Sequence, residues 1–427
     1  MVYVPTTYHI LPSSCHFYAS SCYICQDCVI MCYLQTMDLN FFIEMLGIDS
    51  TSGREREFAE FLAERMAGPG RQIEKQEVPA MAADCPEGCE VPVNLYIKWG
   101  DPKVVFCSHL DTVPPYIPPT VSTLGQSEGG EDVRISGRGT CDAKGQIFSM
   151  WEACLELEHR GCTDFGLLLL AGEETGSFGA KAFNASSVPS DMAPMPLRAV
   201  APSDWVIIVG EPTDNHMTSA SKGTKSFEVT FKGEAFHSGY PQYGCSAVEL
   251  FGDFLNALRS IAFPKDAILG DTTWNIGKLV SDNPQNILSD RLTCRVYFRT
   301  TFESDEMVCN IMKNIAGPDA KLRFGRRRVQ DGSDIVAKEV APWQKAMSVK
   351  AFGGDTPTMY KTLEGFPTKP VAFGSDAPQL KCFERKILCG PGSILVAHRD
   401  EEHINKSDIE AAISNYVRMY ETLVKEK

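Results

Sequence analysis

The sequence predicts an α/β fold with a mostly parallel sheet and a smaller α+β domain inserted into it. From Asp38 onward, helical and strand patterns alternate along the chain, which is the order that builds parallel sheets covered by helices. Three short uncharged apolar runs are bounded by turn residues, as expected for strands buried on both faces. They span residues 104–107, 167–171 and 206–209. The length of 427 residues also favours two domains.

The first and last long helices carry start signals. A capping box of Ser52 and Glu55 predicts the start of the first helix, and Ser407 with Glu410 predicts the start of the last. Apolar residues then recur at helical spacing in both segments. These are Phe58, Phe61, Leu62 and Met66 in the first, and Ile409, Ile413, Val417, Tyr420 and Val424 in the last.

The pattern changes near Ser219 to apolar residues that alternate with polar ones, which predicts a half-exposed antiparallel sheet. Phe227, Val229 and Phe231 form one such strand, and residues 292–299 form another. A helix over 246–259 is predicted to place Val248, Phe251, Leu255 and Leu258 on one face. We therefore divide the chain into a leader at 1–37, a main domain at 38–218 and 334–427, and an inserted domain at 219–333.

Composition excludes several classes of partner. The formal net charge of −14 and the lack of basic blocks argue against nucleic acid. No apolar run approaches the roughly 20 residues that span a bilayer, so no membrane partner is expected. The 16 cysteines are scattered through a long chain with 43% hydrophobic and 22% charged residues, which favours a reduced, cytoplasmic setting over a disulfide scaffold.

The segment before Met37 allows two interpretations. Cys22, Cys25, Cys28 and Cys32 have the spacing of an iron–sulfur ligand run, although Tyr33 replaces the usual proline and there is no second quartet. Residues 1–36 contain no Lys or Arg, so they lack the features of a secretory or transit signal. The alternative is a disordered or non-native leader, with Met37 as the true start.

Residues that can bind metal follow each of the three uncharged strands. His109 and Asp111 follow the first strand, Glu173 and Glu174 the second, and Glu211 the third. Because the ligand crevice of an open α/β sheet lies beyond the carboxyl ends of its strands, these side chains should converge.

Two further segments supply donors of the same kind. Asp142 lies in the glycine-containing run 137–145 just before a predicted helix, and His398 follows the apolar residues 394–397. Taken singly, such residues are often helix caps or solvated loop residues. Adjacent carboxylates after an uncharged strand are costly, however, unless a cation neutralises them. Imidazole and carboxylate donors together suit zinc, or cobalt or manganese.

At these residues the chain resembles the M20 metallopeptidase and deacylase family over roughly 38–427. The resemblance is carried by His-Leu-Asp-Thr-Val-Pro at 109–114, Gly-Arg-Gly-Thr-Cys-Asp-Ala-Lys-Gly at 137–145 and Gly-Glu-Glu-Thr-Gly at 172–176. It implies a zinc-peptidase-like catalytic domain that binds two divalent metal ions. By this resemblance, His109 and Glu211 hold one metal, Glu174 and His398 hold the other, and Asp142 bridges them.

The resemblance also implies roles around these ligands. Glu173 would be the general base and Asp111 would orient His109, while the peptide bond after Asp142 would be cis. The inserted domain would be a lid that forms a homodimer, and its His237 would reach the partner's active site. Asn286 and Arg299 match positions that bind the substrate carbonyl and carboxylate.

The expected reaction is removal of an N-acyl group from a small amino acid. Gly-Pro-Gly-Ser-Ile at 390–394 and Gly-Glu-Pro-Thr at 210–213 favour N-acetylornithine, a step of arginine biosynthesis. Succinyl-diaminopimelate is the second expectation, and a dipeptidase or carboxypeptidase would use the same metals. Ser289, and Gly374-Ser375-Asp376, depart from the usual motifs and leave the acyl group open.

Overall fold

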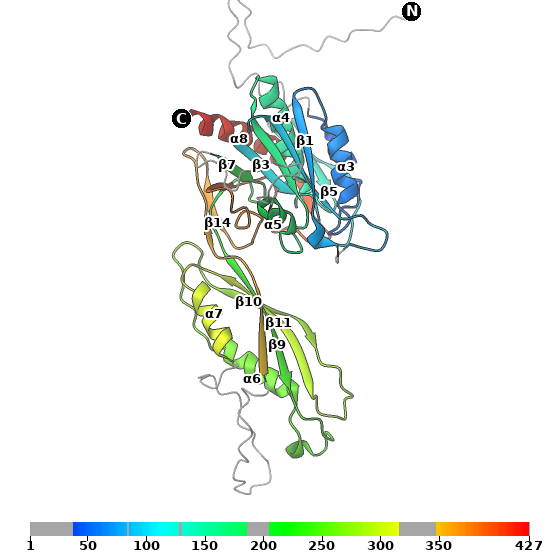
Figure 1. The fold of residues 1–427 in the computed structure, drawn as a ribbon, viewed down its shortest axis with the longest axis vertical. Coiled ribbons are helices and arrows are strands. Elements are labelled where there is room, and N and C mark those ends of the chain that lie inside the picture. The colour runs from blue at the N-terminus through cyan, green and yellow to red at the C-terminus, as the bar shows by residue number, and fades with distance from the viewer. Residues whose placement is uncertain (1–36, 83–84, 128–129, 186–204, 316–346, 427) are drawn as a thin grey trace, which may run out of the picture. The chain divides into compact units, whose positions relative to one another are not determined.

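The structure is a computed structural model that describes residues 37–426, except 83–84, 128–129, 186–204 and 316–346 (Figure 1). The predictions for residues 1–36, including those for Cys22, Cys25, Cys28 and Cys32, lie outside the described residues. The chain divides into two units, Met1–Leu39 and Asn40–Lys427, and everything below concerns the second.

A six-stranded mixed sheet forms the centre of the main domain, in the order β1-β2-β6-β3-β7-β15. The three predicted uncharged strands are neighbours in this sheet and run parallel to one another, so this part of the prediction is confirmed. β15 continues the parallel set, whereas β1 and β2 pair antiparallel. The strands are β1 (Arg71–Glu77), β2 (Val93–Gly100), β3 (Val104–His109), β6 (Asp164–Leu170), β7 (Val206–Val209) and β15 (Arg385–Leu388).

Helices cover both faces of this sheet, as an α/β fold requires. On one face, Phe106 of β3 packs edge-on against Tyr416 of α8, which lies beside α4. On the other face, Val105 and Cys107 share a core cluster with Phe183 of α5. The helices are α2 (Leu39–Leu46), α3 (Arg56–Arg65), α4 (Lys144–His159), α5 (Phe178–Ala185) and α8 (Lys406–Lys425).

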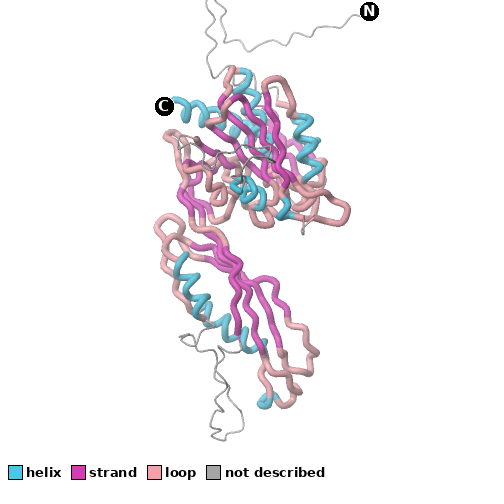
Figure 2. The backbone as a smooth tube through the Cα atoms, in the orientation of Figure 1, coloured by secondary structure: helices cyan, strands magenta, loops and turns pink. Residues whose placement is uncertain are grey.

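A second, four-stranded sheet has the order β10-β11-β9-β12 and is antiparallel throughout. α6 (Ala247–Arg259) and α7 (Asp305–Asn314) lie along one side of it (Figure 2). The predicted alternation is confirmed, since Phe227, Val229 and Phe231 pack in one core with α6. The strands are β9 (Gly223–Lys232), β10 (Thr273–Val280), β11 (Arg291–Thr300) and β12 (Met347–Gly353).

Two details of the inserted segment differ from the prediction. The buried face of α6 consists of Ala247, Leu250, Phe254 and Leu258, whereas Val248 is 46% exposed. Three of the four buried positions are therefore one residue earlier than predicted, and only Leu258 is common to both sets. Strand β12 lies beyond 333, so the sheet takes an edge strand from a segment that was assigned to the main domain. The domain boundaries themselves remain a prediction.

Two three-stranded sheets and two short 3-10 helices complete the described elements. One sheet has the order β16-β5-β4 and the other the order β13-β8-β14. Among the described residues, no helix is both long and apolar enough to cross a bilayer. The elements are β4 (Thr120–Ser127), β5 (Gly130–Ser136), β8 (Met217–Ser221), β13 (Thr358–Met359), β14 (Thr368–Val371), β16 (His403–Asn405), η1 (Pro79–Met81) and η2 (Pro241–Tyr243).

Both predicted helix caps are wrong in detail. Ser52 does not cap α3, because its hydroxyl donates to a carboxylate oxygen of Asp111 at 2.8 Å. Helix α8 begins two residues earlier than the predicted cap requires, and its capping box is formed by Asn405 and Asp408. In the first case a tertiary hydrogen bond replaces the local one.

Glu55 is completely buried, and one of its carboxyl oxygens has no hydrogen-bond partner among the described residues. Burial, reinforced by the charge of Asp111, raises the pKa of Glu55 to about 8. The unfolded chain loses this proton near pH 4.5 while the folded chain keeps it, so the free energy of unfolding should fall as pH rises from about 5 to about 8. Glu55→Gln removes this titration. We expect its stability relative to wild type to increase over that window in urea unfolding of metal-free protein, whereas a constant difference would contradict the assignment.

Candidate metal centre and pocket

The carboxyl ends of β3, β6 and β7 bring the predicted donors together. β3 ends at His109 itself, Glu173 and Glu174 follow β6 in a turn, and Glu211 follows β7. Because the three strands are parallel neighbours, these ends lie at one edge of the sheet. The convergence predicted from the sequence is therefore present in the structure.

Asp142 lies between two histidines. Its Oδ1 is 3.0 Å from Nε2 of His109, and its Oδ2 is 3.2 Å from Nε2 of His398. The same Nε2 of His398 is 2.8 Å from Oε1 of Glu174. Ligand atoms of His109, Asp142 and Glu174 all lie within 4.8 Å of one another, close enough to share a metal ion. A carboxylate with one oxygen toward each imidazole has the arrangement of a bridging ligand.

The charges of this cluster indicate that it needs a cation. Glu211 is buried and its Oε1 has no hydrogen-bond partner among the described residues. Burial, with the neighbouring charges of Asp142, Asp376 and Glu174, raises the pKa of Glu211 well above its usual range. Hydrogen bonds to Asp142 and Glu174 raise the pKa of His398 to about 10, so without metal a proton takes the place of the cation.

The donor set therefore fits the metal ions that the sequence predicts. Two imidazoles and three carboxylates suit zinc, cobalt or manganese and leave room for water or substrate. The assignment of particular ligands to each ion stays a prediction, as does the identity of the metal.

Asp111 contacts both His109 and the turn that carries Glu173 and Glu174. Nδ1 of His109 lies 2.9 Å from the carbonyl oxygen of Asp111 and 3.5 Å from its Oδ1. Asp111 thus contacts the ring nitrogen through which it was expected to orient His109. The carboxylate of Asp111 also accepts hydrogen bonds from the backbone N–H groups of Glu173 and Glu174, at 3.0 and 3.2 Å. It therefore fixes the turn that carries the predicted base as well as the histidine.

Glu402 is a second organising carboxylate, which the sequence analysis missed. Its Oε1 accepts backbone N–H groups of Gly139, Cys141 and Asp142 at 2.9, 3.1 and 3.1 Å. Its Oε2 pairs with the buried guanidinium of Arg138 at 2.5 Å. The peptide bond from Asp142 to Ala143 in this loop is cis, as the resemblance implies. Nothing in the sequence distinguishes Glu402 from its exposed neighbour Glu401.

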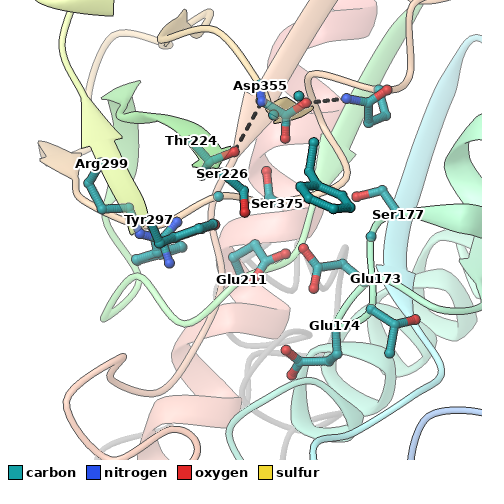
Figure 3. A pocket seen from close by; sticks show the side chains of 18 of the residues that line it. Glu173, Glu174, Ser177, Glu211, Thr224, Ser226, Tyr297, Arg299, Asp355 and Ser375 are labelled. Atoms are coloured by element: carbon teal, nitrogen blue, oxygen red, sulfur yellow. Dashed lines mark hydrogen bonds between the residues drawn. The ribbon is translucent and has the colours of Figure 1, made fainter. Parts of the chain in front are cut away.

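A pocket of about 590 Å³ opens over the cluster. Asp142, Glu173, Glu174, Glu211 and His398 line one part of it. Figure 3 shows the carboxylates of Glu173 and Glu211 pointing toward one another in this space. Burial, together with the charges of the surrounding carboxylates, raises the pKa of Glu173 well above its usual range. A carboxylate held beside the metal ligands is suited to accept a proton.

Arg299 lines the same pocket from strand β11 (Figure 3). Its guanidinium lies over the ring of Tyr297, 5.0 Å from the centroid. The predicted carboxylate-binding residue is thus in one cavity with the predicted base and four of the five predicted ligands, His109 being buried behind them.

His237 and Asn286 are not among the residues that line this pocket. They lie together on adjoining loops, where the N–H of Ser238 donates to the carbonyl of Asn286 at 2.9 Å. The imidazole of His237 is exposed, and its Nδ1 accepts the N–H of Gly239 at 3.0 Å. The predicted role of His237 involves a second chain, that of Asn286 is contact with the substrate carbonyl, and both stay predictions.

Asp376 also belongs to the surroundings of the site, where its charge acts on Glu173 and Glu211. Burial raises the pKa of Asp376 to about 7, and the hydroxyl of Ser177 is its hydrogen-bond partner. Its Oδ1 has no partner in the described part of the chain. A buried acid at this position adds to the negative charge that a metal cluster would balance.

An α/β sheet with imidazole and carboxylate donors at its carboxyl edge, open to a pocket, defines a metal-dependent hydrolase. The model of "Peptidase family M20/M25/M40" matches residues 105–422. A "Probable carboxypeptidase" of Aspergillus terreus is 32% identical over 404 residues, which cover 90% of this chain and 86% of the relative. The chain belongs to peptidase family M20/M25/M40 and is a metallo-hydrolase of that family.

Solved structures share the fold. A tripeptidase from Staphylococcus aureus superposes with a TM-score of 0.67 at 18% identity, covering 92% of this chain and 99% of that one. A dinuclear metal-binding peptidase of the M20 family from Bacillus subtilis gives a TM-score of 0.52 at 13% identity, covering 92% and 99%. These similarities confirm the predicted fold class.

Proposed function

We propose that this chain is a metal-dependent exopeptidase that removes the C-terminal amino acid from short peptides. The observation that carries the proposal is the presence of Arg299 in the same pocket as Glu173 and four of the five predicted ligands. A guanidinium is the side chain best suited to a carboxylate, because it offers two parallel N–H donors. The printed name of the Aspergillus terreus relative supports a carboxypeptidase.

In this proposal Arg299 binds the terminal carboxylate and so directs the adjoining peptide bond toward the predicted ligands. Two bound divalent ions would polarise the carbonyl and acidify a water molecule. Glu173 takes the proton from that water on its carboxylate and later delivers it to the leaving amine nitrogen. Asp111 keeps Glu173 in place through its hydrogen bond to the backbone of that residue.

The first expectation from the sequence, deacetylation of N-acetylornithine, would use the same centre. The ligand motifs are shared by both activities, whereas the names of the relatives favour peptides. Removal of an N-acyl group, including the succinyl group of succinyl-diaminopimelate, is therefore the alternative reaction that the substrate test below must exclude. The names of these relatives give no support to a role in arginine biosynthesis.

We also propose a homodimer formed through the four-stranded sheet and its helices. Exposed apolar side chains gather on the loops beside His237 and Asn286, namely Phe236, Tyr240, Tyr243 and Ile287. A second copy would cover this surface and give the exposed His237 a partner site. Sedimentation of the purified protein measures this state directly.

The proposed reaction is tested with three matched substrates, each assayed with zinc, cobalt or manganese. These are dipeptides with a free C-terminus, the same dipeptides with a C-terminal amide, and N-acyl amino acids that include N-acetylornithine and succinyl-diaminopimelate. We expect the free dipeptides to be hydrolysed and their amides to react about 100-fold more slowly, since the charge-assisted hydrogen bonds are lost. Hydrolysis of the N-acyl amino acids alone would overturn the proposal.

Arg299→Ala tests the carboxylate contact itself. We expect kcat/KM for a free dipeptide to fall about 100-fold in this variant. The kcat/KM for the amidated dipeptide, which is already low in wild type, should change little. Arg291→Ala is the matched control, because Arg291 is an exposed arginine of the same strand that does not line the pocket. Equal losses on free and amidated peptides would mean that Arg299 has only a structural role.

A further inference from the structure

We infer that the pocket selects substrates whose C-terminal residue has an aromatic or other bulky apolar side chain, with Tyr297 and Phe352 as its subsite. The inference rests on the proposed function only in taking Arg299 as the group that binds the terminal carboxylate. The predicted metal ligands and Glu173 act on the peptide bond, so the preference for a C-terminal side chain must come from other residues of the pocket.

The register of strand β11 places Tyr297 and Arg299 on the same face of the sheet. Val296 and Phe298, which alternate with them, are buried in the core with α6 and α7. Arg299 pairs with Thr224 of β9. The face opposite that core is therefore the one that the pocket uses, and Tyr297 lies beside the predicted carboxylate site (Figure 3).

Phe352 reaches the pocket from the neighbouring edge of this sheet. It lies at the irregularity of β12 where the pairing with β9 shifts between Ala351 and Gly353. The guanidinium of Arg295 stacks over its ring at 3.5 Å, and Arg295 is itself paired with Glu228 at 3.3 Å. Lys350 also lies over this ring at 4.8 Å, and neither cation lines the pocket, so the ring is restrained by contacts from outside the cavity. A fixed aromatic ring can bind a ligand side chain with little further ordering cost.

Both rings remain accessible although they line a concave site. Tyr297 is 37% exposed and Phe352 is 44% exposed. Apolar surface in a pocket with a few convergent polar groups is the usual composition of a ligand site. The neighbouring positions on β9 carry the small polar residues Thr224 and Ser226, which leave space between the rings and the predicted metal ligands.

The chemistry of an amino acid connects these rings to Arg299. The side chain branches from the carbon that carries the carboxylate, so a carboxylate held by Arg299 brings that side chain against the adjacent wall. Tyr297 forms this wall, with its ring beneath the guanidinium of Arg299. Glycine at the substrate C-terminus would leave the wall uncovered, whereas phenylalanine or leucine would bury it.

The test compares peptides that differ only in the C-terminal residue: phenylalanine, leucine, glycine and glutamate. We expect kcat/KM for phenylalanine to exceed that for glycine by about tenfold or more, which is the range of discrimination an apolar pocket supplies. Phe352→Ala should reduce this ratio by about tenfold, and Tyr297→Phe should keep most of it because the ring remains. Binding of free L-phenylalanine and of glycine to the Glu173→Gln protein, measured by calorimetry, gives a readout that needs no turnover.

Phe302→Ala is the matched control, because Phe302 is 41% exposed and does not line the pocket. It should leave the ratio unchanged. If peptides are not cleaved but N-acyl amino acids are, the same comparison is made with N-acetylphenylalanine and N-acetylglycine, so failure of the proposed function is separable from failure of this inference. Equal rates for phenylalanine and glycine, a preference for glutamate, or a ratio that Phe352→Ala does not change would each overturn the inference.

Discussion

Replacement of Glu173 by glutamine is expected to lower kcat by about 10²–10⁴-fold, the contribution that a positioned general base makes. Glutamine has the same shape but cannot accept the proton of the attacking water. The backbone N–H of residue 173 would still donate to Asp111, so the turn should keep its conformation. Steady-state kinetics at saturating peptide measures the loss of kcat, and metal analysis of the same sample shows whether the metal centre is retained.

The control for this variant is Glu401→Gln, which changes an exposed glutamate in the loop after His398. It should retain wild-type kcat and metal content. A Glu173→Gln enzyme with more than about a tenth of wild-type kcat would contradict the assignment, and loss of metal in that variant would make Glu173 a ligand instead.

Replacement of Asp142 by asparagine is expected to have the second large effect, because one carboxylate faces both histidines. An amide offers a single oxygen and no charge, so it cannot neutralise two cations in a buried site. Substitution of a residue that only hydrogen-bonds to a metal ligand typically lowers metal affinity by about 10–100-fold. We expect the loss of zinc affinity in Asp142→Asn to be larger. Activity should be lost in parallel.

Competition with a chromogenic chelator measures this affinity, and circular dichroism of the metal-free protein shows whether the fold is retained. Asp400→Asn is a suitable control, since Asp400 is an exposed carboxylate close to His398 in sequence. A zinc affinity of the Asp142→Asn protein within threefold of wild type would show that the bridging position is wrong.

The parts of the fold that the sequence predicts are those set by burial. Strands β3, β6 and β7 are buried along almost their whole length, so an uncharged run is enough to identify them. The caps of α3 and α8 depend on which neighbour a small polar side chain contacts. Ser52 bonds to Asp111, a residue distant in sequence, and no local pattern reports such a contact.

The same distinction holds in the site. Ligands such as His109 and Glu211 are predictable because they follow strands whose ends must meet. Glu402 acts by accepting backbone N–H groups of the loop that contains Asp142, and this requires no particular sequence in the loop. Glu402 follows His398 by four residues and the exposed Glu401 follows it by three, so the sequence alone does not single out Glu402.

Substrate choice is the least predictable property. The metal motifs are common to deacylases and peptidases, so they could not separate N-acetylornithine from a peptide. The residues that differ lie on the pocket wall, such as Phe352 at a strand irregularity and Tyr297 on an open sheet face. Their importance depends on the cavity that they line, which becomes visible only in the folded chain.

The most direct test of the metal centre is an anomalous-difference map from crystals of the zinc-loaded protein, recorded at the zinc absorption edge. The two-metal assignment predicts two peaks, about 3.5–4 Å apart as in other two-metal hydrolases. Asp142 should lie between them, with His109 beside one and His398 beside the other. A single peak, or no peak among these side chains, would contradict the assignment of a two-metal centre.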